Sequence, residues 1–164
     1  MKIKVGLGFD VHQLEQGKEF WLGGILIPHD KGAVGHSDAD VLIHAICDAL
    51  LGAANLRDIG YHFSNTDLKY KGIDSKILLA EVIRLVSDKG YKIGNVDATL
   101  CLEAPKINPY IPQMQEVLSR VMLIDREDVS IKATTNETLG YVGREQGVNA
   151  YAVVLIHKNS PSEN

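Results

Sequence analysis

Apolar and polar residues alternate along several parts of the chain, and this period of two predicts β-strands there. The predicted strands cover residues 3–11, 93–102, 129–133 and 148–156. Within residues 93–102 the alternation is regular, and the apolar face consists of Val96, Ala98, Leu100 and Leu102. Residues 20–28 carry two short apolar runs on either side of a Gly-Gly pair, which is typical of a β-hairpin.

Apolar residues at helical spacing predict three helices. The first begins after Ser37, because Asp40 follows three residues later in a capping-box pattern, and it ends near residue 51. Its predicted buried stripe is Val41, Leu42, Ala45, Ile46, Ala49 and Leu50. The second helix covers residues 74–89, and the third is entered between residues 109 and 112. Residues 55–71 lack a sustained period and are predicted to form a long loop, which is itself a hint of function.

This order of elements predicts an α/β (α+β) fold with a mixed sheet and helices on one face. A chain of 164 residues with 45% hydrophobic content suits a single domain, which we place at residues 1–158 with a frayed tail at 159–164. The last strand is apolar on both faces. We therefore expect helices to cover one side of it and another subunit to cover the other.

Composition excludes several classes of partner. The net charge of −4 and the lack of a basic run argue against nucleic acid and against anionic membrane surfaces. No apolar stretch approaches the length of a transmembrane helix, and the first residues enter a strand pattern without a signal segment. Cys47 and Cys101 are unclustered, which favours a reducing compartment. We expect a cytoplasmic protein.

Asp10, His12 and His44 form the first candidate site. Residues i and i+2 of a strand project from the same face, so Asp10 and His12 can bind one cation while Val11 turns toward the core. His44 shares a face of the first predicted helix with Asp40 and Asp48. Two imidazoles and one carboxylate suit zinc with an open fourth position, as in catalytic sites. The alternative is an ordinary hydrogen-bonded histidine beside a chance Asp-x-His.

A second group of polar residues lies between the last two predicted strands. Thr134 and Thr135 offer hydroxyl donors, and Arg144 can bind a phosphoryl group through two parallel hydrogen bonds. Glu137 suits a hard cation such as magnesium, which commonly takes one protein carboxylate together with phosphate oxygens. This set predicts a diphosphate site. The alternative is a polar hairpin loop without a ligand.

Two shorter segments are ambiguous on their own. His36 and Ser37 precede a helix whose free amides favour an anion, although a serine there can also serve only as a cap. Residues 104–106 can be a simple strand exit, or they can place backbone groups against a base with Lys106 near a phosphate.

Taken in order, these motifs resemble the 2-C-methyl-D-erythritol 2,4-cyclodiphosphate synthase family of the non-mevalonate isoprenoid pathway. The resemblance covers nearly the whole chain. It is carried by residues 8–12, 36–40 with His44, 48–53, 58–60, 104–106, 111–114, 132–135 and 143–144.

The resemblance implies a metal-dependent phosphorus–oxygen lyase that forms a homotrimer, with sheets around a three-fold axis and active sites between subunits. Its small-molecule substrate would be 4-diphosphocytidyl-2-C-methyl-D-erythritol 2-phosphate. The 2-phosphate would attack the β-phosphate in line, which releases CMP and closes the cyclic diphosphate. Asp10, His12 and His44 would be the zinc ligands, and Glu137 would hold a magnesium or manganese ion at the diphosphate.

The resemblance also implies the substrate contacts. The cytidine side would consist of Leu102, Glu103, Ala104, Pro105, Lys106, Ile107 and Asn108. Thr134, Thr135 and Arg144 would contact phosphate, and Tyr141 joins the substrate-binding set. The erythritol-phosphate side would consist of His36, Ser37, Asp48, Asp58, Gly60, Phe63, Ser64, Asn65, Thr66 and Asp67.

The chain departs from the family pattern at Ser64 and Asn65, where Pro and Asp are common, at Gln146, where Glu is frequent, and at Ala39, where Gly is frequent. None of these positions is a predicted metal ligand. Two other functions stay open, a zinc phosphohydrolase and a trimeric nucleotide-binding module with a structural metal. An open zinc position argues against the second, because structural zinc is normally fully bound by protein.

Overall fold

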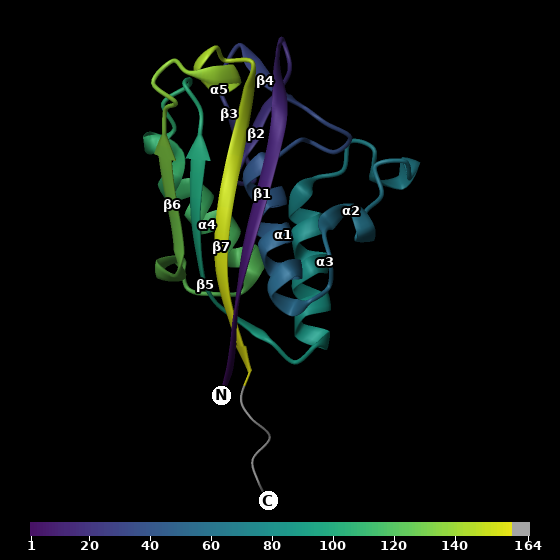
Figure 1. The fold of residues 1–164 in the computed structure, drawn as a ribbon. Helices are drawn as coiled ribbons and strands as arrows, with labels where there is room; N and C mark the ends of the chain where they lie inside the picture. The colour runs from purple at the N-terminus through teal and green to yellow at the C-terminus, as the bar shows by residue number, and fades with distance from the viewer. Residues whose placement is uncertain (159–164) are drawn as a thin grey trace, which may run out of the picture.

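Five strands form a mixed sheet in the order β4-β1-β7-β5-β6 (Figure 1). All neighbouring pairs are antiparallel except β5 and β6, which are parallel. A separate hairpin pairs β2 with β3 across the Gly23-Gly24 turn, as predicted. The strands are β1 (Lys2–Gln16), β2 (Phe20–Leu22), β3 (Ile25–Ile27), β4 (Lys31–Val34), β5 (Lys92–Cys101), β6 (Val129–Thr134) and β7 (Gly147–Lys158). This computed structural model describes residues 1–158, so the predicted frayed tail lies outside the described residues.

Three longer helices lie on one side of the sheet (Figure 1). Helix α1 packs against β1 and β7, α4 packs against β6, and α3 packs against both helices. They are α1 (Val41–Ala54), α3 (Ser75–Asp88) and α4 (Ile111–Met122), and the short ones are α2 (Ile59–His62), α5 (Gly140–Gly143), η1 (Leu68–Tyr70), η2 (Asn108–Tyr110) and η3 (Arg126–Asp128). The predicted α/β class is confirmed. Within residues 1–158, every helix is too short or too polar to span a bilayer.

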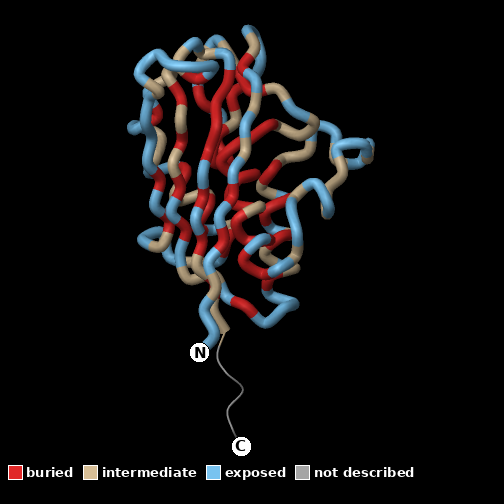
Figure 2. The backbone as a smooth tube through the Cα atoms, viewed as in Figure 1, coloured by how far each residue is buried: buried red, intermediate tan, exposed pale blue. Residues whose placement is uncertain are grey.

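The core lies between the sheet and the helices (Figure 2). The predicted alternation in β5 is confirmed, because Val96, Ala98 and Leu100 are buried there. The matching buried side chains of β7 are Val148, Ala150, Ala152, Val154 and Ile156. In the β1–β7 ladder, Asp10 pairs with Ala150, so the polar part of β1 continues the buried face of the sheet.

The opposite face of the sheet is apolar but uncovered. Val11 is 44% exposed on this face, so the prediction that it turns toward the core is wrong. Helix α1 covers the side that carries Asp10 and His12 instead. Helix α1 also covers one face of β7, as predicted, and the prediction that another subunit covers the opposite face stays a prediction. The exposed apolar residues of β1 and β7 are Ile3, Val5, Leu7, Phe9, Val11, Tyr151 and Val153, which we call the open sheet face.

Helix α1 lies unusually close to β1 because two glycines of the strand face it. A Cβ atom at Gly8 would lie 1.9 Å from the carbonyl oxygen of Ala45. A Cβ atom at Gly6 would lie 1.9 Å from the carbonyl oxygen of Ala49. Both contacts are with backbone, which cannot rotate away, so only glycine permits this approach.

The start of α1 differs from the prediction. Asp40, not Ser37, is the N-cap, and its carboxylate accepts a hydrogen bond from the Ile43 N–H at 3.0 Å. The same carboxylate accepts from the N–H groups of Gly23 and Gly24 at 3.0 and 2.7 Å. Asp40 therefore binds the β2–β3 hairpin to the helix, and it is the N-cap of α1 and not a member of a shared helical face with His44. Burial raises the pKa of Asp40, although the hydrogen bonds from these N–H groups act to lower it.

Other differences concern short elements. Strand β4 was not predicted, and its four residues are too few to show a period. The predicted loop at 55–71 contains α2 and η1, each of which is one turn long. Ala39 has a φ of 58°, so the chain takes a left-handed turn where glycine costs less than alanine.

We expect Gly8→Ala to destabilise the protein by about 1–3 kcal/mol, because the new methyl group would push α1 away from β1. Denaturant unfolding at fixed protein concentration would measure this loss. Gly52→Ala is the matched control, since Gly52 lies in α1 and a Cβ atom there would have no neighbouring atom within 4 Å. The control should be neutral or stabilising, and equal destabilisation of both variants would contradict the close approach.

Candidate metal centre and adjoining pockets

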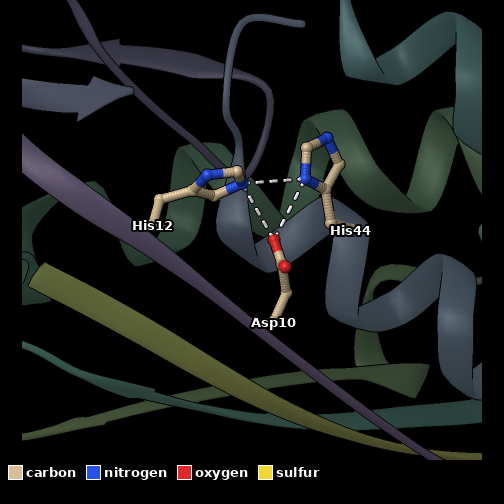
Figure 3. Close-up of side chains that lie close together, drawn as sticks. All are labelled: Asp10, His12 and His44. Carbon is tan, nitrogen blue, oxygen red and sulfur yellow. Dashed lines mark hydrogen bonds and ion pairs between the residues drawn. The ribbon is translucent and has the colours of Figure 1, made fainter. Parts of the chain in front are cut away.

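Three side chains point toward one another between β1 and α1 (Figure 3). Asp10 Oδ2 lies 2.9 Å from His12 Nε2 and 3.0 Å from His44 Nδ1. The two histidine nitrogens lie 3.1 Å apart. Ligand atoms of a tetrahedral zinc ion are separated by about 3.3 Å, so a small outward movement of these side chains would accommodate the ion. The donor set therefore fits zinc, and the structure brings the three predicted ligands together.

Local backbone features place each ligand. Asp10 and His12 project from the same face of β1 because they are two residues apart. His44 lies one residue before Ala45, whose carbonyl group packs on Gly8, so the close approach of helix and strand also brings His44 to Asp10. Gly35 leaves room for the His12 ring, since a Cβ there would lie 3.0 Å from His12 Cε1.

The second nitrogen of each imidazole also has a partner. His12 Nδ1 lies 2.9 Å from the Val34 carbonyl oxygen, to which it can donate. His44 Nε2 lies 3.1 Å from Ser37 Oγ and 2.9 Å from Ser75 Oγ. Such contacts orient the rings of metal-binding histidines, so both ligand nitrogens are directed at the same centre.

The contacts between Asp10 and the two histidines favour a negative charge on Asp10 and a positive charge on His12. Burial alone would raise the pKa of Asp10, but hydrogen bonds and charge interactions with His12 and His44 lower it to about 2. Burial lowers the pKa of His12, yet its contacts with Asp10 outweigh this effect and raise it. A carboxylate that stays ionised across the physiological range is ready to bind a cation.

A cavity of about 420 Å³ lies beside the three ligands. Its lining includes the predicted residues Asp10, His12, His36, Ser37, His44, Gly60, Phe63 and Asn65. It also includes Tyr70, Ile73 and Leu78, which sequence reasoning missed. Tyr70 packs edge-on against Phe63, with ring centroids 5.4 Å apart. One wall of the cavity is thus apolar, and the three candidate metal ligands form part of the polar wall.

A second cavity of about 240 Å³ lies at the ends of β5 and β6. These strands are parallel, so their carboxyl ends meet at the same edge, where the Leu102 N–H donates to the Thr134 carbonyl group at 3.0 Å. The lining contains the predicted residues Leu102, Glu103, Pro105, Lys106, Ile107, Asn108, Thr134 and Thr135. Ala104, which was predicted with them, precedes Pro105 through a cis peptide bond and is not in the lining.

Several predicted residues of the erythritol-phosphate side hold backbone in place. Asp48 and Asp58 accept from the N–H groups of Ile59 and Tyr61 at 2.7 and 2.9 Å, so both stabilise the start of α2. Burial raises the pKa of Asp48. Asp67 caps η1, and its carbonyl oxygen lies 3.1 Å from His36 Nε2. The side chains of Ser64 and Thr66 are hydrogen-bonded to each other at 2.7 Å.

The remaining predicted residues lie in the connection between β6 and β7. Glu137 has a φ of 50° and Thr138 a φ of 64°. Thr135 Oγ1 donates to Glu137 Oε1 at 2.9 Å, and Glu103 Oε1 accepts from the Thr138 N–H at 2.6 Å. Glu103 therefore connects the smaller cavity to the segment that carries Glu137.

Two further contacts order the end of this connection. Arg144 Nε donates to Gln146 Oε1 at 3.1 Å, so the departure at Gln146 keeps a partner for the arginine. Tyr141 OH accepts from Asn149 Nδ2 at 2.7 Å.

Residues 3–157 match the model of the YgbB family. This chain belongs to the YgbB family. A relative from Cytophaga hutchinsonii, named 2-C-methyl-D-erythritol 2,4-cyclodiphosphate synthase, is 68% identical over 96% of this chain and 99% of its own length. The resemblance inferred from the motifs is thereby confirmed.

Solved structures of YgbB relatives share the fold. A 2C-methyl-D-erythritol-2,4-cyclodiphosphate synthase described as a CDP-bound form has a TM-score of 0.87 and 38% identity, over 94% of this chain and 100% of that chain. The bifunctional IspDF from Campylobacter jejuni has a TM-score of 0.93 and 34% identity over 97% of this chain. This chain spans only 43% of that bifunctional protein.

Sequence reasoning assigned no role to Asp38 or Ser75, although Ser75 contacts His44 and Asp38 contacts Ser75. Asp38 stands within a motif that carries the family resemblance, which was the available signal. Ser75 follows a predicted helix start 31 residues from His44, and nothing local indicates that the two meet.

The stability of the metal-free protein should depend on pH because of Asp10. Its pKa falls from 3.8 to about 2 on folding, so its stabilising contribution is complete above pH 4 and is lost as the pH falls toward 2. Asp10→Asn should cost up to about 2 kcal/mol above pH 4, since one pKa unit corresponds to about 1.4 kcal/mol and the site is partly screened by solvent.

Denaturant unfolding with a chelator present, from pH 2 to pH 7, would measure this difference. The difference in the free energy of unfolding between wild type and Asp10→Asn should decrease steadily below pH 4. A difference that stays constant over this range would show that Asp10 does not interact with the two histidines as described.

Proposed function

We propose that this chain is a metal-dependent phosphorus–oxygen lyase that converts 4-diphosphocytidyl-2-C-methyl-D-erythritol 2-phosphate into 2-C-methyl-D-erythritol 2,4-cyclodiphosphate and CMP. The observation that carries the proposal is the convergence of Asp10, His12 and His44 beside a cavity. Family membership and the names of the relatives support it. A cytoplasmic location and a single domain over residues 1–158 stay predictions.

The reaction needs no nucleophile from the protein. An oxygen of the 2-phosphate forms a bond to the β-phosphorus, and the bond from this phosphorus to the bridging oxygen breaks. The electron pair of that bond leaves with CMP. The protein must hold the attacking oxygen, the phosphorus and the leaving oxygen in line and must offset the negative charge that keeps phosphates apart.

Asp10, His12 and His44 would hold a zinc ion. Bound there, zinc would supply Lewis acidity toward a phosphoryl oxygen and a fixed point for orienting the substrate. Three protein ligands next to a cavity are typical of catalytic zinc sites, whereas structural sites are closed by four protein ligands.

The β6–β7 connection would serve the diphosphate. Glu137 would hold magnesium or manganese, whose charge would offset that of the α- and β-phosphates. The hydroxyls of Thr134 and Thr135 donate to the Thr135 carbonyl group and to Glu137 in this structure, and they would turn to donate to phosphate oxygens. Arg144 would bind one phosphoryl group through its guanidinium.

The cavity at the ends of β5 and β6 suits the cytidine part of the substrate. The CDP-bound form of a related structure supports a nucleotide ligand for this family. Lys106 lines the cavity and carries a positive charge suited to a phosphate.

We further propose that a complete site forms between two chains of a homotrimer. The metal centre lies on β1 and the nucleotide cavity on β5 and β6, which are separated by β7 in the sheet. The two cavities share no lining residue. In a ring with the open sheet faces turned inward, the metal edge of one chain would meet the nucleotide edge of its neighbour, and the exposed apolar residues would be buried.

Two other functions use the same residues. In a zinc phosphohydrolase, water would attack the phosphorus and the product would be linear. In a trimeric nucleotide-binding module, the metal would be structural and no product would form. The cavity beside the metal ligands favours a catalytic role over the structural one.

Phosphorus NMR of the purified protein with the CDP-linked substrate, zinc and magnesium would separate these functions. We expect CMP and a cyclic diphosphate. A linear product would indicate the hydrolase, and unchanged substrate with nucleotide bound would indicate the binding module. Asp10→Ala and His44→Ala should lower turnover at least about 100-fold, because charge stabilisation of this size is typical of such groups.

Asp88→Ala is the control for these variants. Its carboxylate pairs with Arg84 on the outer surface of α3, and the variant should keep normal turnover. Near-normal cyclisation by Asp10→Ala or His44→Ala, with the oligomer intact, would refute the metal assignment.

The trimer is tested by a charge on the open sheet face. Leu7 is 68% exposed there, and Leu7→Glu should prevent association, because burying an unpaired carboxylate is costly. Light scattering should give three times the chain mass of 18.0 kDa for wild type and a lower mass for the variant.

Ile77→Glu is the control for Leu7→Glu. Ile77 is 58% exposed on α3, away from the open sheet face, and its variant should remain trimeric. A wild-type protein that is monomeric at micromolar concentration, or a Leu7→Glu variant that stays trimeric, would argue against this interface.

A further inference from the structure

The face of His44 that points away from the candidate metal centre contacts a buried serine. Ser75 is fully buried at the first position of α3, and its Oγ lies 2.9 Å from His44 Nε2. The hydroxyl of Ser75 donates to Asp38 Oδ1, and the Ser75 N–H donates to Asp38 Oδ2 at 2.9 Å. Asp38, Ser75 and His44 thus form a continuous chain of hydrogen bonds that ends at a predicted metal ligand.

The direction of this chain is set by Asp38. An ionised carboxylate can only accept hydrogen bonds, so the Ser75 hydroxyl must use its single hydrogen toward Asp38. The serine oxygen can then only accept from His44, which requires the hydrogen of the imidazole to lie on Nε2. A neutral imidazole with its hydrogen on Nε2 presents the lone pair of Nδ1, the atom that faces Asp10 and His12.

We propose that Asp38 and Ser75 are positioning residues, which keep the His44 hydrogen on Nε2 and so set the metal affinity of the site. This inference rests on the metal site of the proposed function. Contacts of this kind around metal-binding histidines typically change metal affinity by about 10–100-fold.

Ser37 is a weaker candidate for this role. Its Oγ lies 3.1 Å from the same nitrogen, but it also accepts from the Ala39 N–H and lines the cavity beside the metal centre. A substrate could therefore compete for the Ser37 hydroxyl. Ser75 does not line that cavity, so its contact with His44 is available whether or not the cavity is filled.

Capping of α3 does not account for Asp38. The helix already has Asp74 as its N-cap, and the Asp74 carboxylate accepts from the Lys76 N–H at 2.8 Å. Asp38 adds a bond to the Ser75 backbone, but a capping role leaves the contact with the Ser75 hydroxyl unexplained. That second contact is the one that determines the direction of the chain to His44.

Asp38→Asn tests the direction of the hydrogen bonds between Asp38, Ser75 and His44, because asparagine has almost the same shape as aspartate. The Ser75 N–H donates to Asp38 Oδ2 at 2.9 Å and the Asp40 N–H donates to Oδ1 at 3.3 Å, so the shorter bond favours the amide oxygen toward the Ser75 N–H. The NH₂ group then faces Ser75 Oγ and donates to it. The serine hydroxyl is then free to donate to His44 Nε2, which favours the hydrogen on Nδ1 and blocks the ligand atom. We expect the dissociation constant for zinc to rise about 10–100-fold.

Ser75→Ala is a second variant that removes the acceptor itself. It should also weaken zinc binding, by about 10-fold or more. Competition with a chromophoric chelator would measure the dissociation constants of zinc, and the absorption bands of bound Co²⁺ would report the ligand geometry. Denaturant unfolding of the metal-free proteins would show that each variant folds.

Each variant has a matched control. Asp74→Asn removes the same charge at the start of the same helix but does not touch His44. Ser119→Ala removes a buried hydroxyl on α4, where Ser119 Oγ donates to the Glu116 carbonyl group. Both controls should bind zinc as tightly as wild type and leave the Co²⁺ spectrum unchanged.

The outcomes are distinct. Weaker zinc binding by Asp38→Asn and Ser75→Ala, with the controls unchanged, supports the inference. Wild-type affinity in both variants, or a loss no larger than in the controls, overturns it and leaves the proposed function intact. A wild-type protein that does not bind zinc overturns the metal site of the proposed function and this inference together.

Discussion

The close packing of α1 on β1 determines where Asp10 and His44 stand relative to each other. Gly6 and Gly8 let the helix backbone rest directly on the strand, where any side chain would meet a carbonyl oxygen. This contact brings His44 within 3.0 Å of Asp10 although the two are far apart in the sequence. The candidate metal centre is therefore a product of backbone packing, and Asp10, His12 and His44 need no long flexible side chain to reach one another.

Carboxylates in the segment before α1 support this packing from two sides. Asp40 binds the hairpin turn and the first turn of α1, while Asp38 binds the start of α3. Because the two residues have different partners, the short segment between β4 and α1 is connected to three other elements. His36 and Ser37 belong to the same segment and line the cavity. The hydrogen bonds of Asp38 and Asp40 therefore also hold these two cavity residues in position.

Local pattern was sufficient for the longer elements, and it placed Asp10 and His12 on one face of a strand and His44 on a helix, because alternation and helical spacing are properties of neighbouring residues. It showed that Val11 and Asp10 point in opposite directions, but not which direction was the core, since that depends on where α1 packs. It placed the cap at Ser37 because the glycine N–H groups that bind Asp40 come from a distant hairpin. Ser75 was missed for the same reason, as its contact with His44 exists only in the folded chain.

Every residue of β1 between Gly6 and His12 contributes to one of two faces of the strand. Between Gly6 and His12, even-numbered residues meet the helix or the metal centre, and odd-numbered residues lie on the open sheet face. Inserting or deleting one residue in this stretch would exchange the two sets and put apolar side chains where the ligands stand. Length variation among relatives should therefore be confined to the connections outside this strand, and the spacing from Gly6 to His12 should be invariant.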